Sequence, residues 1–175
     1  MHKNAVPICF VALFLVLSSA CGWHLRGAEG HTVAFDRLHI SASDLRSDLV
    51  RQLTRQFEAS GVELVESATG ATYSLVLMNQ DSERRTATVS ASARVSERSL
   101  TERVEFVVLD RQGAPVIPRT KVVAERIFEY DESNVLAADD EARLLKREMQ
   151  EDLARQIYNR LRLLKKPASA NAPAS

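Results

Sequence analysis

The sequence has few cysteines, few histidines and no net charge. Its 175 residues include two cysteines and four histidines, and 23 basic side chains balance 23 acidic ones. Cys9 lies inside an apolar leader and Cys21 directly follows it, so removal of the leader leaves no partner for an internal disulfide. One remaining cysteine excludes zinc fingers and CxxC redox chemistry. The balanced charge provides no global basic field to recruit nucleic acid, so no nucleic-acid partner is predicted.

The sequence also lacks the short motifs of common catalytic sites. HExxH, GxSxG and GxxxxGK[ST] do not occur. His2 leaves with the leader, and His24, His31 and His39 lie near Cys21 or on the first predicted strand. The acidic residues follow helix faces and turns, where solvated charge is the ordinary explanation. These observations give little support for catalysis, and we predict no cofactor or metal site; a hydrolase built on paired carboxylates is left as an alternative.

The first 20 residues have the three parts of an export signal. A short positive start precedes the unbroken apolar stretch 8–17, which is too short to span a bilayer comfortably. Small residues then lead to Cys21. Two interpretations follow: an ordinary secretory signal, because Ser-x-Ala suits the general signal peptidase, or a lipoprotein signal cut before Cys21. Ser18 departs from the lipoprotein pattern, which has leucine three residues before the cysteine; here Leu17 lies one residue earlier.

We favour the lipoprotein interpretation, because small residues directly before the chain's only other cysteine are uncommon by chance. The predicted modification of Cys21 is a diacylglyceryl thioether with an amide-linked acyl chain. Each buried methylene contributes about 0.8 kcal/mol, so several chains hold a protein firmly on a membrane. Gly22 replaces the aspartate that typically retains lipoproteins in the inner membrane. The predicted location is the outer membrane, facing the periplasm, with 21–32 as the lipidated anchor segment.

The mature chain begins with a pattern typical of a β-α-β unit. Strands are expected at 34–41, where apolar and polar residues alternate, and at 62–66. Ser43 and Asp44 predict a helix start between them, and Gly61 predicts its end. This order favours a parallel pair of strands with a helical crossover. The predicted buried face of the helix consists of Leu45, Leu49, Val50, Leu53 and Phe57.

Three further strands and a long helix follow. Alternation predicts strands around Leu75, around Phe106 and over 122–130, and a turn at 111–115 separates the last two. Short turns favour an antiparallel meander. The period then becomes helical, and Pro167 ends the helix. Its predicted apolar stripe is Leu144, Leu145, Met149, Leu153, Ile157, Leu161 and Leu164. Charges that suit the helix dipole are Asp139, Asp140 and Glu141 near the start and Arg160, Arg162, Lys165 and Lys166 near the end.

The sequence therefore predicts one α+β domain over 33–166. We expect a two-layer sandwich with two amphipathic helices packed on a mixed β-sheet of about four to five strands. The helices cover one face of the sheet, and the other face is available to a partner or to solvent. Residues 167–175 are rich in alanine, serine and proline and predict a disordered tail.

One stretch, Thr86–Ser99, alternates like a strand but has only alanine and valine as apolar residues. One interpretation is a solvated edge hairpin whose charges discourage aggregation. The other is a β-rich protrusion that inserts into a polar environment or meets anionic groups, since arginine binds phosphates in a bidentate manner. The arginines that flank or lie within this stretch are Arg84, Arg85, Arg94, Arg98 and Arg103.

Three parts of the chain together resemble the LptE family, the lipopolysaccharide-assembly outer-membrane lipoproteins. Cys21–Gly27, CGWHLRG, is similar to the mature start of the family. Leu53–Leu64 resembles its first helix end and second strand, and Leu136–Leu161 resembles its last helix. The resemblance therefore covers most of the mature domain in the same order.

The resemblance implies a small α/β sandwich that sits as a plug in the lumen of LptD, a large outer-membrane β-barrel. The pair delivers lipopolysaccharide to the outer leaflet, and the lipoprotein also aids barrel assembly and is reported to bind lipopolysaccharide. The family's basic contact positions fall on Ala91 and Ala138 here, so Arg94 and Arg98 are the nearby candidates for lipopolysaccharide contact. Alternatives are a secretin pilot, a barrel-assembly accessory lipoprotein, or a soluble periplasmic enzyme.

Overall fold

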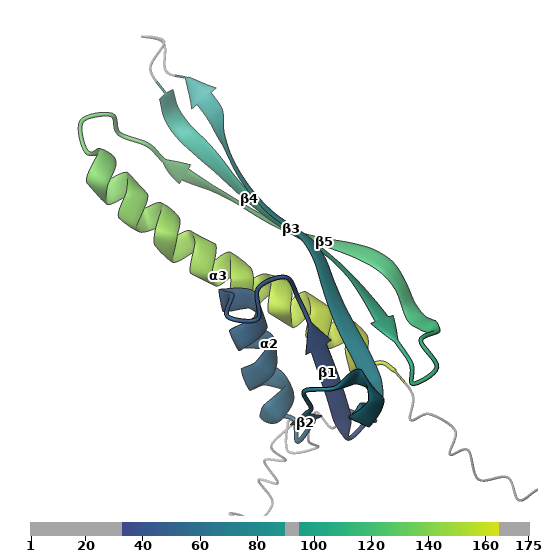
Figure 1. Cartoon of the computed structure of the whole chain (residues 1–175). Coiled ribbons are helices and arrows are strands. Elements are labelled where there is room, and N and C mark those ends of the chain that lie inside the picture. The colour runs from purple at the N-terminus through teal and green to yellow at the C-terminus, as the bar shows by residue number, and fades with distance from the viewer. Residues whose placement is uncertain (1–32, 90–94, 165–175) are drawn as a thin grey trace, which may run out of the picture. The chain divides into compact units, whose positions relative to one another are not determined.

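The computed structural model describes residues 33–89 and 95–164 (Figure 1). The predicted signal peptide, the anchor with Cys21, the predicted tail and Arg94 lie outside these residues. Two helices pack on one side of a five-stranded mixed sheet of order β2-β1-β3-β4-β5. The predicted α+β two-layer sandwich is confirmed. Among the described helices, none is long and apolar enough to cross a membrane.

The strands follow the predicted topology. The short strands β1 and β2 run parallel to each other, β1 also pairs in parallel with β3, and β3, β4 and β5 form the antiparallel meander. A single 3-10 turn, η1, joins β2 to β3. The elements are β1 (Arg37–Ser41), α2 (Asp48–Glu58), β2 (Glu63–Leu64), η1 (Ala68–Gly70), β3 (Tyr73–Val89), β4 (Val95–Leu109), β5 (Pro115–Glu129) and α3 (Val135–Leu161).

The first helix, α2, begins later than the sequence predicts. Ser47, not Ser43, is its N-cap, and the Ser47 hydroxyl accepts a hydrogen bond from the Val50 amide at 3.4 Å. Leu45 therefore precedes the helix and is 60% exposed, so its predicted place in the buried stripe is wrong. Gly61 follows the helix with a φ of +81°, a conformation that glycine adopts at little cost, and the predicted stop is confirmed.

The second helix, α3, has 27 residues and begins at Val135. The Asn134 side chain caps it by accepting a hydrogen bond from the Ala137 amide at 3.4 Å. The first turn contains no acidic residue, so the predicted acidic start of the helix is displaced toward its second turn. Leu144 is 49% exposed, because it lies on the side of α3 that faces away from the sheet, and its predicted place in the apolar stripe is wrong.

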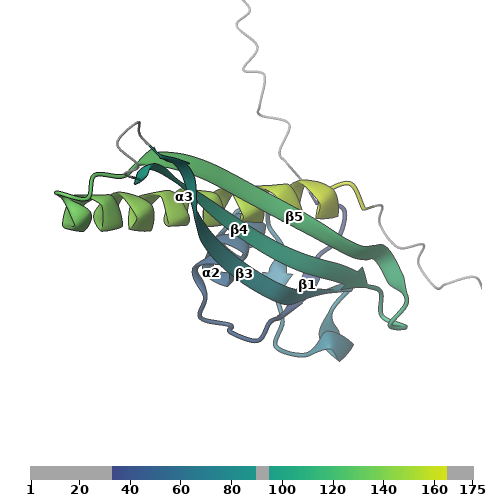
Figure 2. The same ribbon diagram turned by 90° about the horizontal axis from the view of Figure 1, so that it is seen from above.

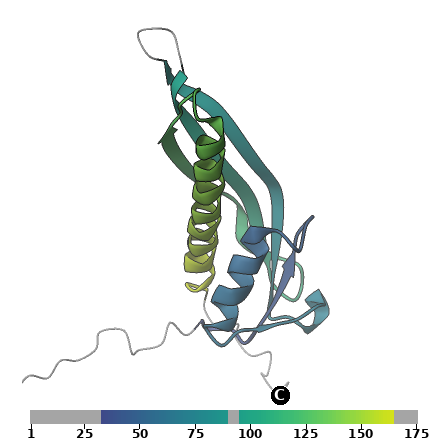
Figure 3. The same ribbon diagram turned by 90° about the vertical axis from the view of Figure 1, so that its left-hand side faces the viewer.

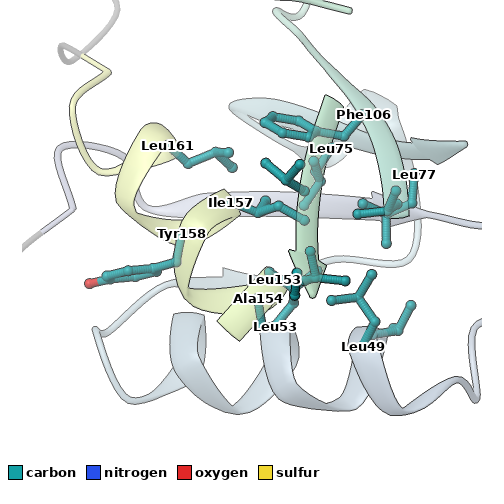
Figure 4. Packing of buried hydrophobic residues seen from close by; sticks show 14 of the residues in the cluster. Leu49, Leu53, Leu75, Leu77, Phe106, Leu153, Ala154, Ile157, Tyr158 and Leu161 are labelled. Carbon is teal, nitrogen blue, oxygen red and sulfur yellow. The ribbon is translucent and has the colours of Figure 1, made fainter. Parts of the chain in front are cut away.

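The largest side chains of the core lie between the sheet, α2 and the C-terminal half of α3 (Figure 4). α2 has 11 residues and packs along the C-terminal half of α3, and among the described residues no helix lies beside the N-terminal half of α3 (Figure 3). In that half, the buried positions of α3 are the small side chains Ala138 and Ala142. The largest fully buried side chains are Phe57, Phe106, Leu38, Leu49, Leu53, Leu75, Met149, Leu153, Ile157 and Leu161.

Candidate functional site

The face of the sheet turned away from the helices, which we call the open face, carries paired charges. The Arg103 guanidinium on β4 lies 3.0 Å from the Asp81 carboxylate and 2.8 Å from that of Glu83, both on β3. Hydrogen bonds from Arg103 and then Arg85 lower the pKa of Glu83. The carboxylates of β3 are therefore neutralised by arginines of the same face.

The pairing continues across the open face toward β5. Arg119 donates a hydrogen bond to the Glu105 carboxylate at 2.6 Å, and Asn79 donates to the same carboxylate at 3.0 Å. The Arg119 bond and then the Asn79 bond lower the pKa of Glu105. Two apolar side chains of β5, Val123 and Ile127, are exposed among these polar groups. The open face is thus a polar surface with balanced charge rather than a basic patch or an apolar one.

On the opposite face, a buried carboxylate connects the sheet to α3. Glu102 of β4 is 3% exposed and accepts hydrogen bonds from Ser82 of β3 and from Gln150 of α3, the latter at 2.6 Å. The Lys146 ammonium of α3 lies 3.6 Å from the same carboxylate and 3.2 Å from the Ser82 hydroxyl. A buried charge is tolerated when it is paired and hydrogen-bonded in this way.

Sequence reasoning missed Glu102, although a signal was present. Glu102 has the same parity along β4 as Val104, Phe106 and Val108, whose side chains fill the core. Because side chains alternate between the two faces of a strand, this spacing places Glu102 on the helix-covered face. A buried position for an acidic residue was therefore readable from the period of two.

The far end of the β3–β4 hairpin contains the second predicted contact residue. The Arg98 guanidinium stacks over the Tyr130 ring, 3.5 Å from its centroid. The nearby pocket, with a volume of about 730 Å³, is bounded by the hairpin, the end of β5 and the start of α3. Its lining includes the carboxylates of Glu97, Glu129, Asp131, Glu132 and Glu141. Arg98 thus lies beside an acidic surface, and Arg94 is outside the described residues.

Neither of the two interpretations of Thr86–Ser99, a solvated edge hairpin or a β-rich protrusion, describes the stretch completely. β4 is flanked by β5 up to the pair of Glu97 with Glu129, so β4 is not an edge strand there. β3, in contrast, has no strand on its outer side beyond Val76 within the described residues. The described arginines of this region have partners within the domain: Arg84 pairs with Asp139, Arg85 with Glu83, Arg103 with Asp81 and Glu83, and Arg98 with Tyr130.

The polar groups described above are held by hydrogen bonds and ion pairs within the domain. Within 33–89 and 95–164, no group of three or more His, Cys, Asp or Glu side chains is placed to hold a metal ion. The Nδ1 atom of His39 on β1 lies 3.0 Å from the carbonyl oxygen of Val65, the residue that follows β2. The imidazole ring therefore has a hydrogen-bond partner within the domain.

The family of the chain is decided by a match that spans the described domain. The LptE family model, described as lipopolysaccharide-assembly, matches residues 35–161, from before β1 to the end of α3. The chain belongs to the LptE family. Membership confirms the resemblance found in the sequence and implies a role in lipopolysaccharide transport.

Curated LptE relatives cover most of the chain. The LPS-assembly lipoprotein LptE of Photorhabdus laumondii is 27% identical over 159 residues, which are 91% of this chain and 86% of the relative. The LPS-assembly lipoprotein LptE of Pectobacterium atrosepticum is 26% identical over 152 residues, 86% of this chain and 82% of the relative. These relatives support the lipoprotein class for this member of the family.

Solved structures of lipoproteins share the fold. Rare lipoprotein B from Shewanella oneidensis has a TM-score of 0.65 and 26% identity, and covers 72% of this chain and 93% of its own. The uncharacterized lipoprotein B from Nitrosomonas europaea has a TM-score of 0.67 and 26% identity, with 78% and 88% covered. The arrangement of α2 and α3 on the sheet is therefore common to this LptE chain and to solved lipoproteins.

Proposed function

We propose that this chain is a lipid-anchored outer-membrane protein that works with an LptD-type β-barrel to assemble lipopolysaccharide at the cell surface. In this role it is a plug in the barrel lumen and an aid to barrel assembly, and it makes or breaks no covalent bond. The observation that carries the proposal is the LptE family match over residues 35–161. The relatives are named for lipopolysaccharide assembly rather than for a reaction.

The surface of the domain supports the plug role. The lumen of a large outer-membrane barrel is polar, so a domain inside it needs a polar surface without strong net charge. The open face meets this requirement because its carboxylates and guanidinium groups pair with one another, as Arg103 does with Asp81 and Glu83. The whole chain has no net charge.

A lipid on Cys21 supports the same role through concentration. An anchor on the periplasmic side of the outer membrane confines the domain to the membrane that holds the barrels. Once the domain is anchored, its effective concentration near a barrel is raised. The intact mass of the mature protein tests the anchor, because acylation adds acyl mass to the chain that begins at Cys21. A mass equal to that of the unmodified polypeptide would remove the anchor and favour an ordinary secretory signal.

The lipopolysaccharide-binding element is proposed at Arg94 and Arg98. Arginine suits the phosphates of an anionic glycolipid, and Arg98 lies near the far end of the β3–β4 hairpin, where it pairs with Thr86 in the strand register. The double change Arg94→Glu with Arg98→Glu is expected to weaken lipopolysaccharide binding in vitro. The matched control replaces Arg55 and Arg162 by glutamate, since these arginines end α2 and α3. If the two double variants bind lipopolysaccharide equally well, Arg94 and Arg98 do not form a lipopolysaccharide-binding element.

Purification from detergent-solubilised outer membrane tests the partner. We expect an LptD-type barrel to co-purify with the tagged full-length protein in a fixed ratio. Co-purification of a secretin, or of a barrel-assembly machine without such a barrel, would replace the proposal by a pilot or accessory role.

A further inference from the structure

The outer edge of β3 changes character half-way along the strand. Near its start, Tyr73–Val76 pairs in parallel with β1. From Leu77 to Val89 the strand continues alongside β4, and among the described residues no strand lies on its other side (Figure 1). The change coincides with an irregularity between Met78 and Asp81, where Asn79 has a φ of 47°. The bulge therefore separates a covered edge from an open one.

The helix side of this stretch is open as well. α3 packs along β5 and β4 (Figure 2), and it reaches β3 through long polar side chains. Arg84 lies 3.0 Å from Asp139, and Lys146 lies 3.2 Å from the Ser82 hydroxyl. A pocket of about 260 Å³ lies at the foot of the stretch, between the start of α2, the β3 bulge and α3. β1 and α2 lie beside the first part of β3, and the space next to Asp81–Thr88 continues in line with them.

The other two edge strands, β2 and β5, carry features that limit strand addition, in β5 mainly over its first residues. β2 has only two residues. β5 contains Pro115 and Pro118, which lack the backbone donor that strand pairing requires. The Val123 carbonyl of β5 already accepts a hydrogen bond from the Gln156 side chain at 3.3 Å. β3 has no proline from Leu77 to Val89, so each residue of this stretch has a backbone N–H as well as a C=O group.

The charges on the edge argue against a second copy of the same chain as the occupant. A symmetric antiparallel pairing keeps corresponding side chains on the same face, so it must centre on a residue, and the middle of Asp81–Thr88 is Arg84 or Arg85. It would place that arginine directly opposite the same arginine of the other copy, and like charges in directly opposite positions are destabilising. A different chain with acidic or hydroxyl side chains at those positions avoids this repulsion and gains charge-assisted bonds.

We propose that the outer edge of β3 between Asp81 and Thr88 binds an extended segment of the partner barrel by backbone strand pairing, with acidic or hydroxyl side chains opposite Arg84 and Arg85. This inference rests on the proposed function, because it takes the barrel as the partner. Backbone hydrogen bonds supply affinity in such strand addition, and alternate side chains supply specificity. The space between this part of β3 and α3 can accommodate the side chains of the added strand.

Site-specific photo-crosslinking in the full-length, membrane-derived complex tests the edge. A photoreactive residue is placed in turn at Gln80, Arg85 and Ala87 on β3, and at Lys121 and Glu125 on β5 as controls; all five positions are exposed. We expect the β3 crosslinks to map to one short segment of the barrel and to advance along it in order. The β5 crosslinks are expected to map elsewhere in the barrel.

The outcomes separate this inference from the proposed function. If the barrel co-purifies but the β3 crosslinks are absent, scattered or directed to a second copy of this chain, the edge assignment is wrong and the barrel partnership stands. If no barrel co-purifies, both are wrong. Amide exchange gives an independent readout: peptides within Asp81–Thr88 are expected to exchange at least about tenfold more slowly in the complex than in the free protein. Unchanged exchange would exclude backbone pairing.

Discussion

Gln150 makes a stability contribution that can be worked out from its position. Its side-chain amide donates to the Glu102 carboxylate at 2.6 Å, and that carboxylate is 3% exposed. Replacement of Gln150 by leucine leaves part of a buried charge without a donor. Hydrogen bonds to charged groups contribute about 1.5–3 kcal/mol, and Ser82 still donates to the carboxylate. We therefore expect Gln150→Leu to lower the free energy of unfolding by about 2 kcal/mol.

A hydrogen bond between α2 and α3 that ends next to Gln150 provides the control. Gln52 of α2 donates to Glu151 of α3 at 2.9 Å, but this pair is exposed. Gln52→Leu is expected to change the stability by less than about 0.5 kcal/mol, as exposed substitutions do. Lys146→Met is expected to cost less than about 1 kcal/mol, because the lysine is half exposed and lies 3.6 Å from Glu102.

Urea unfolding of the soluble Cys21→Ala protein, followed by circular dichroism, measures all three variants. The expected order of destabilisation is Gln150→Leu first, then Lys146→Met, then Gln52→Leu. If Gln150→Leu is as stable as the unsubstituted protein, or if Gln52→Leu costs as much, then the buried carboxylate does not connect α3 to the sheet as described.

Three further predictions follow from the core, the helix contact and the open face. Phe106→Ala removes a fully buried ring and is expected to cost about 3–5 kcal/mol in urea unfolding; a cost below 1 kcal/mol would contradict its place in the core. Tyr158→Phe removes the 2.7 Å bond to the Ser60 hydroxyl and is expected to cost about 1 kcal/mol by the same assay. Arg103 lowers the pKa of Glu83, so the stability from this pair is present above 4.5, the ordinary pKa of glutamate, and is lost as the pH falls through the lowered value. The melting temperature of Arg103→Gln should therefore lie below that of the unsubstituted protein above pH 4.5, and the difference between the two should shrink in acid. A difference that does not depend on pH would refute the linkage.

Much of the fold was predictable because the apolar periods are clear. Leu49, Leu53 and Phe57 recur every four residues and do form the buried side of α2. Leu45 continues the same spacing, but the Ser47 cap starts the helix after it. Periodicity places residues on a face only within the helix, and the cap that sets its boundary is a local hydrogen bond. Two serines within five residues offered two possible caps.

The candidate site was less predictable, because it depends on pairing across strands. The arginines of the hairpin suggested a basic surface, yet Arg103 pairs with Asp81 and Glu83 from the neighbouring strand. Those partners are about 20 residues apart in sequence, and their register follows from the bulge at Asn79. The open edge of β3 was equally hidden, since it exists only because β1 is much shorter than β3.

Thiol accessibility on two opposite surfaces tests the plug role most directly. Glu125→Cys lies on the open face of the sheet, and Arg147→Cys lies on the outer side of α3, where both native side chains are exposed. A domain enclosed by a barrel lumen is covered on both surfaces, so we predict that maleimide labelling of both cysteines slows at least about tenfold when the protein is in the purified barrel complex. Slowing at one position with an unchanged rate at the other would place the domain beside the barrel and contradict the account.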